Sequence, residues 1–165
     1  MIVFKEVLDD GAIMAVEGLA REIWREHFTP IIGEAQVAYM LKEFQSSAAI
    51  KRWLAQGYKY YLVDVDGILA GYLGVLAKPE EGTLFLSKIY LLSGYRGRGM
   101  GQQMMGFVEN MARKNGLKKI SLNTNKKNLD TIRFYEKAGF VKRCSDVVDF
   151  GGGFVADDWR MEKAV

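Results

Sequence analysis

Apolar residues in the first third of the chain recur every three or four positions, which is the spacing of one face of a helix. Asp9 and Asp10 precede this stripe and can accept hydrogen bonds from the free amides of a first helical turn. The pattern predicts a helix that starts after these aspartates and that Thr29 and Pro30 stop. Its apolar positions are Ile13, Val16, Leu19, Ala20, Ile23 and Trp24, followed by His27.

Two more helices and one strand are predicted in the same third of the chain. The strand covers residues 2–7, before the first helix. Ser46 and Ser47 can cap the third helix by accepting amide hydrogen bonds. The apolar positions of the second and third helices are Val37, Met40, Leu41 and Phe44, and then Ile50, Trp53 and Leu54.

Strand patterns replace the helical spacing after Gly57. Aromatic and β-branched residues fill 58–65, the dipeptide Asp66-Gly67 is typical of a tight hairpin turn, and an apolar run resumes over 68–76. The other predicted elements are a strand over 83–92 that completes an antiparallel meander, a helix from Met100 to Gly116, a strand over 120–124, a helix over 129–138, and a hairpin over 140–148 and 154–161.

This order of elements combines a meander with a crossover unit. It predicts an α/β or α+β fold in which one mixed sheet lies between helices. At 165 residues, of which 49% are hydrophobic and 26% charged, the chain has the length and composition of one globular domain. We therefore expect a single domain over residues 1–165.

The composition also limits the chemistry. Cys144 is the only cysteine and His27 the only histidine, so neither an internal disulfide nor a metal site of these ligands is expected. Cys144 is expected to be a small buried apolar residue in a strand. The formal net charge of +3 is too small to indicate a nucleic-acid partner. The chain lacks a signal-peptide pattern and an apolar run of about 18 residues, so we expect a cytoplasmic protein without a membrane partner.

A glycine-rich segment lies between a predicted strand and a predicted helix, with the sequence Tyr95-Arg96-Gly97-Arg98-Gly99-Met100-Gly101-Gln102. Glycines let a backbone approach a ligand closely, and the amides at a helix N-terminus attract anions. The segment lacks the Gly-Lys-Ser/Thr ending of a nucleotide-triphosphate loop and the Gly-x-Gly-x-x-Gly spacing of a dinucleotide fingerprint. It predicts a cradle for a diphosphate, with Arg96 and Arg98 adding positive charge.

Two motifs around this segment resemble those of a known enzyme family. The pattern Arg96-x-x-Gly99-x-Gly101 resembles the acetyl-CoA signature of the GNAT superfamily of N-acetyltransferases. Asn123, Asn128 and the run from Phe134 to Phe140, which reads Phe-Tyr-x-x-x-Gly-Phe, resemble its second cofactor segment. The residues 22–33 and 157–162 look like a bacterial group of this superfamily without a settled substrate.

The resemblance implies a GNAT-like fold, with a mixed, mostly antiparallel central sheet of about seven strands flanked by helices on both faces, in the order β-α-α-β-β-β-α-β-α-β-β. It implies acetyl-CoA as the cofactor, CoA as the product, and Tyr135 as the residue that gives a proton to the departing thiolate. Lys126 and Lys127 are further candidates to screen a phosphate. The implied cofactor-binding residues are Leu91, Leu92, Arg96, Gly97, Arg98, Gly99, Met100, Gly101, Gln102, Asn123, Asn128 and Tyr135.

The resemblance also places the acceptor, a primary amine that attacks directly in a ternary complex, beside the end of the first helix. The implied acceptor residues are Trp24, Glu26, His27 and Phe28. Some superfamily members carry a basic glutamate on the strand before the glycine turn, but residues 84–90 contain no carboxylate. Glu26 and His27 are therefore candidate catalytic bases.

The acceptor class stays open among small-molecule amines, polyamines and peptides. The acidic residues Glu22, Glu26, Asp149, Asp157 and Asp158 would suit a cationic polyamine if they gather near the acceptor. An alternative function is a catalytically silent acyl-CoA-binding regulatory module, because a fold does not fix an activity. Edge strands near the C-terminus can also pair in a homodimer.

Overall fold

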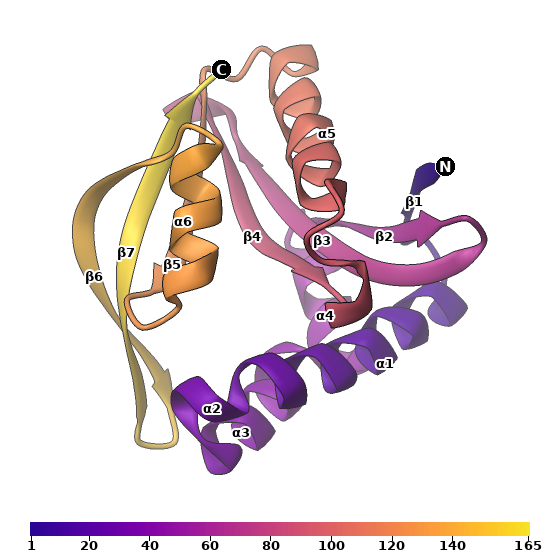
Figure 1. Cartoon of the computed structure of the whole chain (residues 1–165), viewed down its shortest axis with the longest axis vertical. Coiled ribbons are helices and arrows are strands. Elements are labelled where there is room, and N and C mark those ends of the chain that lie inside the picture. Colours follow the sequence, from indigo (N-terminus) through magenta and orange to yellow (C-terminus); the bar gives the residue numbers. More distant parts are fainter. The chain divides into compact units, whose positions relative to one another are not determined.

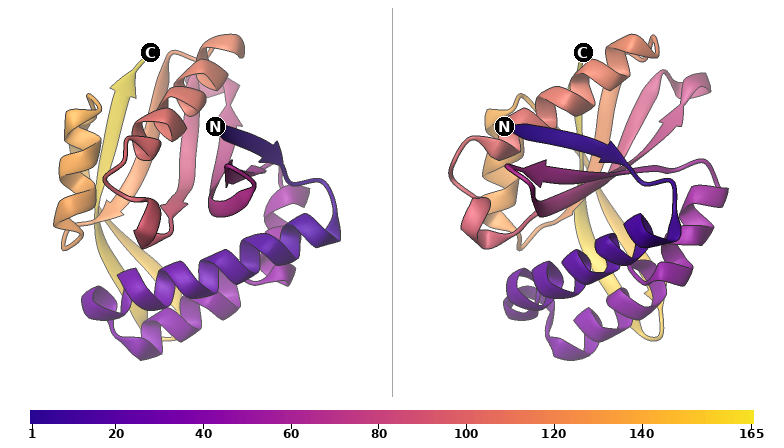
Figure 2. Two further views of the ribbon diagram at one scale, coloured as in Figure 1. Left: turned by 45° about the vertical axis from the view of Figure 1, so that its right-hand side comes forward. Right: turned by 90° about the vertical axis from the view of Figure 1, so that its right-hand side faces the viewer.

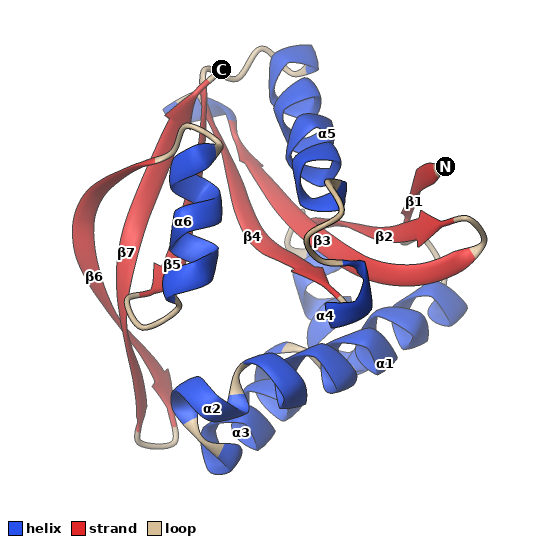
Figure 3. Cartoon of the chain, in the orientation of Figure 1, coloured by secondary structure: helices blue, strands red, loops and turns tan.

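The computed structural model describes residues 1–165, and seven strands form its sheet in the order β1-β2-β3-β4-β5-β7-β6 (Figure 1). The β1–β2, β2–β3, β5–β7 and β6–β7 pairs are antiparallel, and β4–β5 is parallel. Helices flank the sheet, so the predicted mixed α/β fold of about seven strands is confirmed (Figure 3). None of the helices is both long and apolar enough to cross a bilayer.

The chain divides into two compact units. Unit 1 contains residues 1–76 and 88–101, and unit 2 contains residues 77–87 and 102–165. Strand β4 (Thr83–Leu91) and helix α5 (Met100–Lys114) each contribute residues to both units. The expectation of a single domain over residues 1–165 stays a prediction.

The helices of unit 1 begin largely where the sequence places them. Asp9 caps α1, since its carboxylate accepts a hydrogen bond from the Ala12 amide at 2.8 Å. The Ser46 hydroxyl likewise accepts from the Ala49 amide at 3.2 Å. The helices are α1 (Asp10–His27), α2 (Thr29–Ile32), α3 (Glu34–Phe44) and α4 (Ser47–Ala55), which lie together in both views of Figure 2.

The prediction that Thr29 and Pro30 simply stop the first helix is incomplete. Helix α1 ends at His27, and Pro30 then lies in the first turn of the short helix α2, which the apolar pattern did not indicate. Proline suits this position because its missing N–H would have no partner in a first helical turn. The break falls at Phe28, whose amide donates to the Trp24 carbonyl at 2.9 Å.

The β2–β3 hairpin is the centre of the sheet part of unit 1. Asp66 and Gly67 have φ angles of 52° and 87°, the left-handed values that a tight hairpin turn requires. Gly71 allows a close approach between neighbouring strands, because a Cβ atom there would lie 2.3 Å from the Tyr90 carbonyl oxygen. The strands of this unit are β1 (Ile2–Glu6), β2 (Lys59–Val65), β3 (Ile68–Lys78) and the end of β4.

Unit 2 combines the start of β4 with the C-terminal half of the chain. Thr83–Phe85 pair in parallel with Lys119–Ser121, and β7 lies antiparallel to β5 on the other side. Its buried apolar residues include Met104, Val108, Leu122, Ile132 and Met161. Its other elements are β5 (Lys119–Asn125), α6 (Leu129–Lys137), β6 (Val141–Gly151) and β7 (Phe154–Ala164).

The expectation that Cys144 is buried is wrong. Its strand β6 is at the edge of the sheet and most of its residues are exposed, Cys144 among them. An edge strand has a neighbour on one side only, so its side chains are less covered than those of a central strand.

Two glycine substitutions test the packing of unit 1. Gly71→Ala is expected to destabilise the fold by about 2 kcal/mol or more, because its methyl group must displace the β4 backbone. Gly18→Ala is the matched control: Gly18 is exposed within α1, with no atom within 4 Å of a Cβ, so alanine is expected to stabilise by about 0.5–1 kcal/mol. Denaturant unfolding measures both changes, and equal changes would contradict the close approach.

Candidate active site

The turn between β4 and α5 presents main-chain amides. Gly97 and Gly99 have φ angles of 71° and 81°, and a Cβ on either would point into open space. The amides of residues 97–99 make no hydrogen bond within the chain, and the first amides of α5 have no helical partner. Together with the positive end of the helix dipole, these amides fit a diphosphate.

The two arginines of this turn hold its conformation. The Arg96 Nε donates to the Leu91 carbonyl at 2.9 Å, and its Nη1 is 3.5 Å from the His27 Nδ1. The Arg98 Nη1 donates to the Gly94 carbonyl at 3.2 Å. Both side chains therefore have partners in the chain, and the diphosphate contacts expected of them stay predictions.

The main-chain groups of Leu92, which follows the last residue of β4, already have partners within the chain. The Leu92 amide donates to the Ala70 carbonyl of β3 at 2.8 Å, and the Leu92 carbonyl accepts from the Tyr95 amide at 3.0 Å. Because successive residues of a strand direct their hydrogen-bonding groups to opposite sides, the Leu91 amide points away from β3. Leu91 is thus the better placed of the two for a ligand.

Aromatic side chains from α1 and the strands of unit 1 pack together. The Trp24 ring is 4.2 Å from Phe28 and 5.7 Å from Tyr90, and Tyr90 is 5.3 Å from Tyr72, measured between ring centroids. The Tyr72 hydroxyl donates to the Gln45 Oε1 at 2.9 Å. Trp24 is 5% exposed, and its indole N–H has no hydrogen-bond partner. The structure therefore brings together the predicted acceptor residues Trp24 and Phe28.

The other two predicted acceptor residues differ in their surroundings. The His27 ring lies edge-on to Phe28, with 4.8 Å between centroids. The His27 Nδ1 lies 3.5 Å from the Arg96 guanidinium, and its role as a base stays a prediction. Glu26 is exposed at the end of α1.

Lys88 is a buried cation that sequence analysis did not single out. Its Nζ lies 5.1 Å from the Trp53 ring centroid, 5.5 Å from Tyr60 and 5.7 Å from Tyr58. Burial lowers the pKa of Lys88 to about 8. Aromatic faces stabilise an ammonium group electrostatically, and this offsets part of the desolvation. Lys88 and the three aromatic rings around it belong to unit 1, and Lys88 is on the same strand as Tyr90 and Leu91.

Tyr135 lies in the core of unit 2, between the rings of Phe134 and Phe140, each 5.7 Å away. Burial raises the pKa of the Tyr135 phenol, so its oxygen keeps the proton at neutral pH. Asn128 is buried at the N-cap of α6, and its carbonyl accepts from the Ile132 amide at 3.0 Å. The structure thus supports a protonated phenol as a hydrogen-bond donor.

The polar residues that follow β5 have partners on the β6–β7 hairpin. The Asn123 amide group donates to the Asp146 Oδ2 at 3.1 Å. Lys126 pairs with Asp157 at 2.9 Å and donates to the Ser145 hydroxyl at 2.7 Å. Asn123 is therefore hydrogen-bonded to a carboxylate, and Lys126 has partners on the hairpin. The cofactor roles expected of both residues stay predictions.

The model of the acetyltransferase (GNAT) family matches residues 18–140. The chain belongs to this family. An uncharacterized N-acetyltransferase of Mycobacterium tuberculosis is 32% identical over 112 residues, which are 67% of this chain and 71% of the relative. The family resemblance read from the two motifs is thereby confirmed: the protein is an N-acetyltransferase and acetyl-CoA is its acetyl donor.

Solved structures of GNAT proteins share the fold over the whole chain. The PaiA N-acetyltransferase of Thermoplasma acidophilum, in complex with coenzyme A, has a TM-score of 0.79 at 21% identity and covers 100% of this chain and 99% of its own. A spermidine N-acetyltransferase chimera from Vibrio cholerae and hSSAT has a TM-score of 0.74 at 18% identity and covers 99% and 95%. At such identities the likeness shows the fold.

Substitutions in the turn test whether its backbone binds the cofactor. Gly97→Ala is expected to weaken CoA binding by about tenfold, because alanine disfavours a φ of 71° by roughly 1–2 kcal/mol, so the free turn relaxes and CoA has to restore its conformation. Gly94→Ala is the control in the same turn, since Gly94 has no positive φ and nothing within 4 Å of a Cβ. Calorimetric titration with CoA measures both variants, and equal losses would contradict the special role of Gly97.

Proposed function

We propose that this GNAT enzyme moves an acetyl group from acetyl-CoA to a primary amine by direct attack in a ternary complex. The observation that carries the proposal is the glycine turn, whose amides at residues 97–99 have no partner in the chain and stand at the N-terminus of α5. The oxygens of an anionic ligand can accept hydrogen bonds from these amides, and the positive end of the helix dipole favours the negative charge.

The donor is bound mainly by backbone groups in this proposal. Residues Gly97 to Gln102 hold the diphosphate of acetyl-CoA. The Leu91 amide, which faces away from β3, donates a hydrogen bond to the pantetheine arm. Acetyl-CoA supplies the thioester whose acetyl group is transferred. Arg96 holds the turn against the Leu91 carbonyl, which keeps these amides in one orientation.

Tyr135 serves as the donor to the leaving sulfur. Its raised pKa keeps the phenol protonated, which suits a donor and excludes a tyrosinate base near neutral pH. Asn128, buried at the start of the same helix, orients the segment that carries Tyr135.

The acceptor lies against α1 in this proposal. Trp24 and Phe28 provide an apolar wall. His27 and Glu26 lie at the end of the same helix and contribute polar contacts. Small-molecule amines, polyamines and peptides are all candidate acceptors, and a bacterial cytoplasm is the proposed setting, in keeping with the mycobacterial relative.

A thiol-release assay tests this function. With acetyl-CoA, we expect free thiol to appear in proportion to acetylated product for at least one of four amine classes: a polyamine, a peptide, an amino acid and an aminoglycoside. Tight CoA binding without amine-dependent thiol release would instead support the silent regulatory module. An absence of CoA binding by calorimetry would contradict both functions.

Removing one oxygen atom tests the role of Tyr135. Tyr135→Phe is expected to lower kcat by at least about tenfold with little change in acetyl-CoA affinity, because a missing proton donor affects chemistry and not binding. Tyr61→Phe is the matched control, because it removes a tyrosine hydroxyl from β2, outside the proposed site. Steady-state kinetics and calorimetry separate the two effects, and an unchanged kcat would remove Tyr135 from the mechanism.

A further inference from the structure

Strands β2, β3 and β4 place phenols and a lysine on one face of the sheet in unit 1. Tyr60 is the register partner of Gly74, so the two share a face, and Tyr72 shares it because it lies two residues before Gly74. Lys88 and Tyr90 are two residues apart on β4 and contact this face. The Lys88 Nζ is 5.5 Å from the centroid of the Tyr60 ring, and the Tyr90 ring is 5.3 Å from that of Tyr72. The face therefore combines hydrogen-bond donors from three strands.

Lys88 is the only lysine or arginine of the chain that is buried, with an exposed fraction of 7%. The rings of Trp53, Tyr58 and Tyr60 lie near its ammonium group and offset part of the desolvation, but they supply no negative charge. Burial lowers the pKa of Lys88 to about 8, so the ammonium form still predominates at about pH 7. This face of the sheet thus contains a buried positive charge.

The Tyr60 hydroxyl is a buried donor without a partner. The residue is fully buried, and its oxygen makes no hydrogen bond within the chain. Burial raises the pKa of this phenol, so the oxygen keeps its proton and can donate at neutral pH. The Tyr72 hydroxyl differs, because it donates to Gln45. A buried donor that lacks an acceptor destabilises a fold, and an oxygen atom of a ligand would satisfy it.

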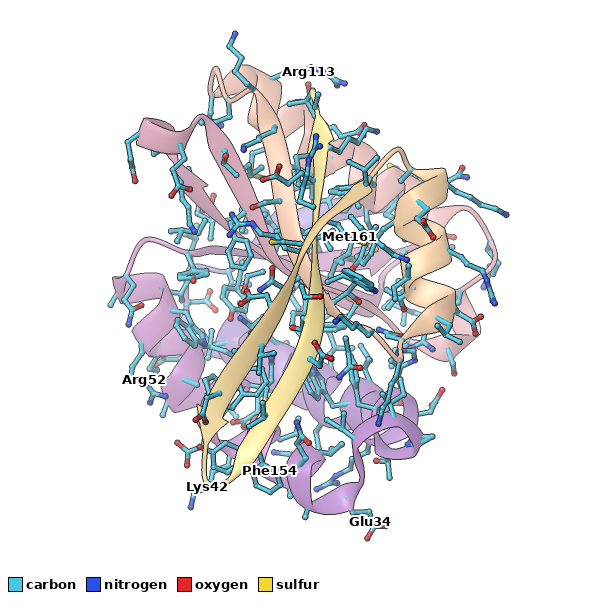
Figure 4. The ribbon with its side chains drawn as sticks, turned by 90° about the vertical axis from the view of Figure 1, so that its left-hand side faces the viewer. Glu34, Lys42, Arg52, Arg113, Phe154 and Met161 are labelled. Atoms are coloured by element: carbon cyan, nitrogen blue, oxygen red, sulfur yellow. The ribbon has the colours of Figure 1, made fainter.

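Two other charged residues of unit 1 leave the buried part of this face positive. Asp64 is the only buried carboxylate of the unit, and the Lys5 Nζ donates to it at 2.7 Å. Arg52, next to Trp53 in the sequence, lies on the outer side of α4 in Figure 4, and its Nη2 donates to the Glu43 carbonyl at 3.0 Å. An anion is therefore the kind of ligand that this face favours.

Lys88 and Tyr60 adjoin the proposed acceptor wall through Tyr90. The Tyr90 ring lies 5.7 Å from Trp24 and 6.0 Å from Phe28, measured between centroids. Lys88 precedes Tyr90 by two residues, which is about 7 Å along a strand. All of these residues belong to unit 1. An acceptor held against the wall can therefore extend a second functional group toward the ammonium and the phenol.

We propose that Lys88 and the Tyr60 hydroxyl bind a carboxylate of the acceptor, so that the substrate is a primary amine that also carries a carboxylate. This inference rests on the proposed acetyl transfer and narrows its acceptor to amino acids and short peptides. A carboxylate offers a negative charge to the ammonium and an oxygen that accepts from the phenol. A polyamine offers neither, and Lys88 repels its ammonium groups. The two residues position the acceptor and form no bond to it.

Matched amines that differ only in a carboxylate test the substrate class. Two pairs are L-lysine with cadaverine and L-phenylalanine with phenethylamine. The dipeptide phenylalanyl-glycine and its C-terminal amide form a third pair, which distinguishes a peptide acceptor from a free amino acid. In at least one pair, kcat/KM is expected to be about tenfold higher or more for the member with the carboxylate. Equal values within every pair, or higher values without the carboxylate, would overturn the inference.

Lys88→Met removes the charge and keeps an unbranched side chain. It is expected to lower kcat/KM for the carboxylate-bearing acceptor by about tenfold or more, mainly through KM, and to leave the amine without a carboxylate unchanged. Lys59→Met, at an exposed position of β2, controls for the loss of a positive charge. An equal loss of kcat for both members of a pair would contradict recognition of the carboxylate by Lys88.

Tyr60→Phe tests the second donor and keeps the charge of Lys88. Its expected effect is a KM for the carboxylate-bearing acceptor that is higher by about threefold to tenfold. The melting temperature is expected to stay the same or rise, because a buried donor without an acceptor has been removed. A lower melting temperature with an unchanged KM would assign the hydroxyl a structural role and exclude it from the site.

Ligand binding separates this inference from the proposed function. With CoA present, at least one carboxylate-bearing member of the three pairs is expected to raise the melting temperature more than its partner does, and Lys88→Met should abolish this difference. If the difference is observed and no amine is acetylated, the acetyl transfer fails and the carboxylate site remains. If spermidine or cadaverine is acetylated and the carboxylate-bearing amines are not, the acetyl transfer stands and the carboxylate site fails.

Discussion

The start of α5 depends on an acceptor from outside the helix. A helix leaves its first amides without carbonyl partners, and here the preceding residues 97–99 add amides that are also unpaired. Gly97 and Gly99 make this possible because their left-handed φ angles are accessible to glycine without strain. Recognition of a diphosphate by such a turn rests on the backbone, so the surrounding side chains are available for other contacts.

Arg96 shows this separation of roles. Its guanidinium bridges the Leu91 carbonyl at the end of β4 and approaches His27 at the end of α1. One side chain therefore connects the strand that precedes the turn with the helix that carries the proposed acceptor wall. A planar guanidinium with several donors suits this bridging position, since a lysine would offer one point charge and no fixed geometry.

Buried polar groups that lack partners occur in unit 1 of the chain. The indole N–H of Trp24 and the hydroxyl of Tyr60 are unpaired among aromatic side chains. Each of these groups destabilises the fold. Enzymes often place such strained or unsatisfied groups where they bind substrate, at some expense of stability.

Local patterns were enough to predict most elements and the family. The stripe from Ile13 to Trp24 and the Asp66-Gly67 turn depend on neighbouring residues, which is why their positions were predicted to within a few residues. Three features were not predicted from local patterns: the break at Phe28, the exposure of Cys144 and the main-chain partners of Leu92. Each of them depends on which other segment of the chain packs next to the residue.

The sequence by itself predicted the glycine turn and the helix that carries Tyr135, since both belong to short motifs whose spacing is written along the chain. Only the tertiary structure decided that Arg96 binds the end of β4 and that the Lys88 ammonium lies near the Tyr60 ring. The physical reason is that strand order, register and burial set these neighbours, and residues of β2 and β4 meet only when the arrangement of the strands between them is known.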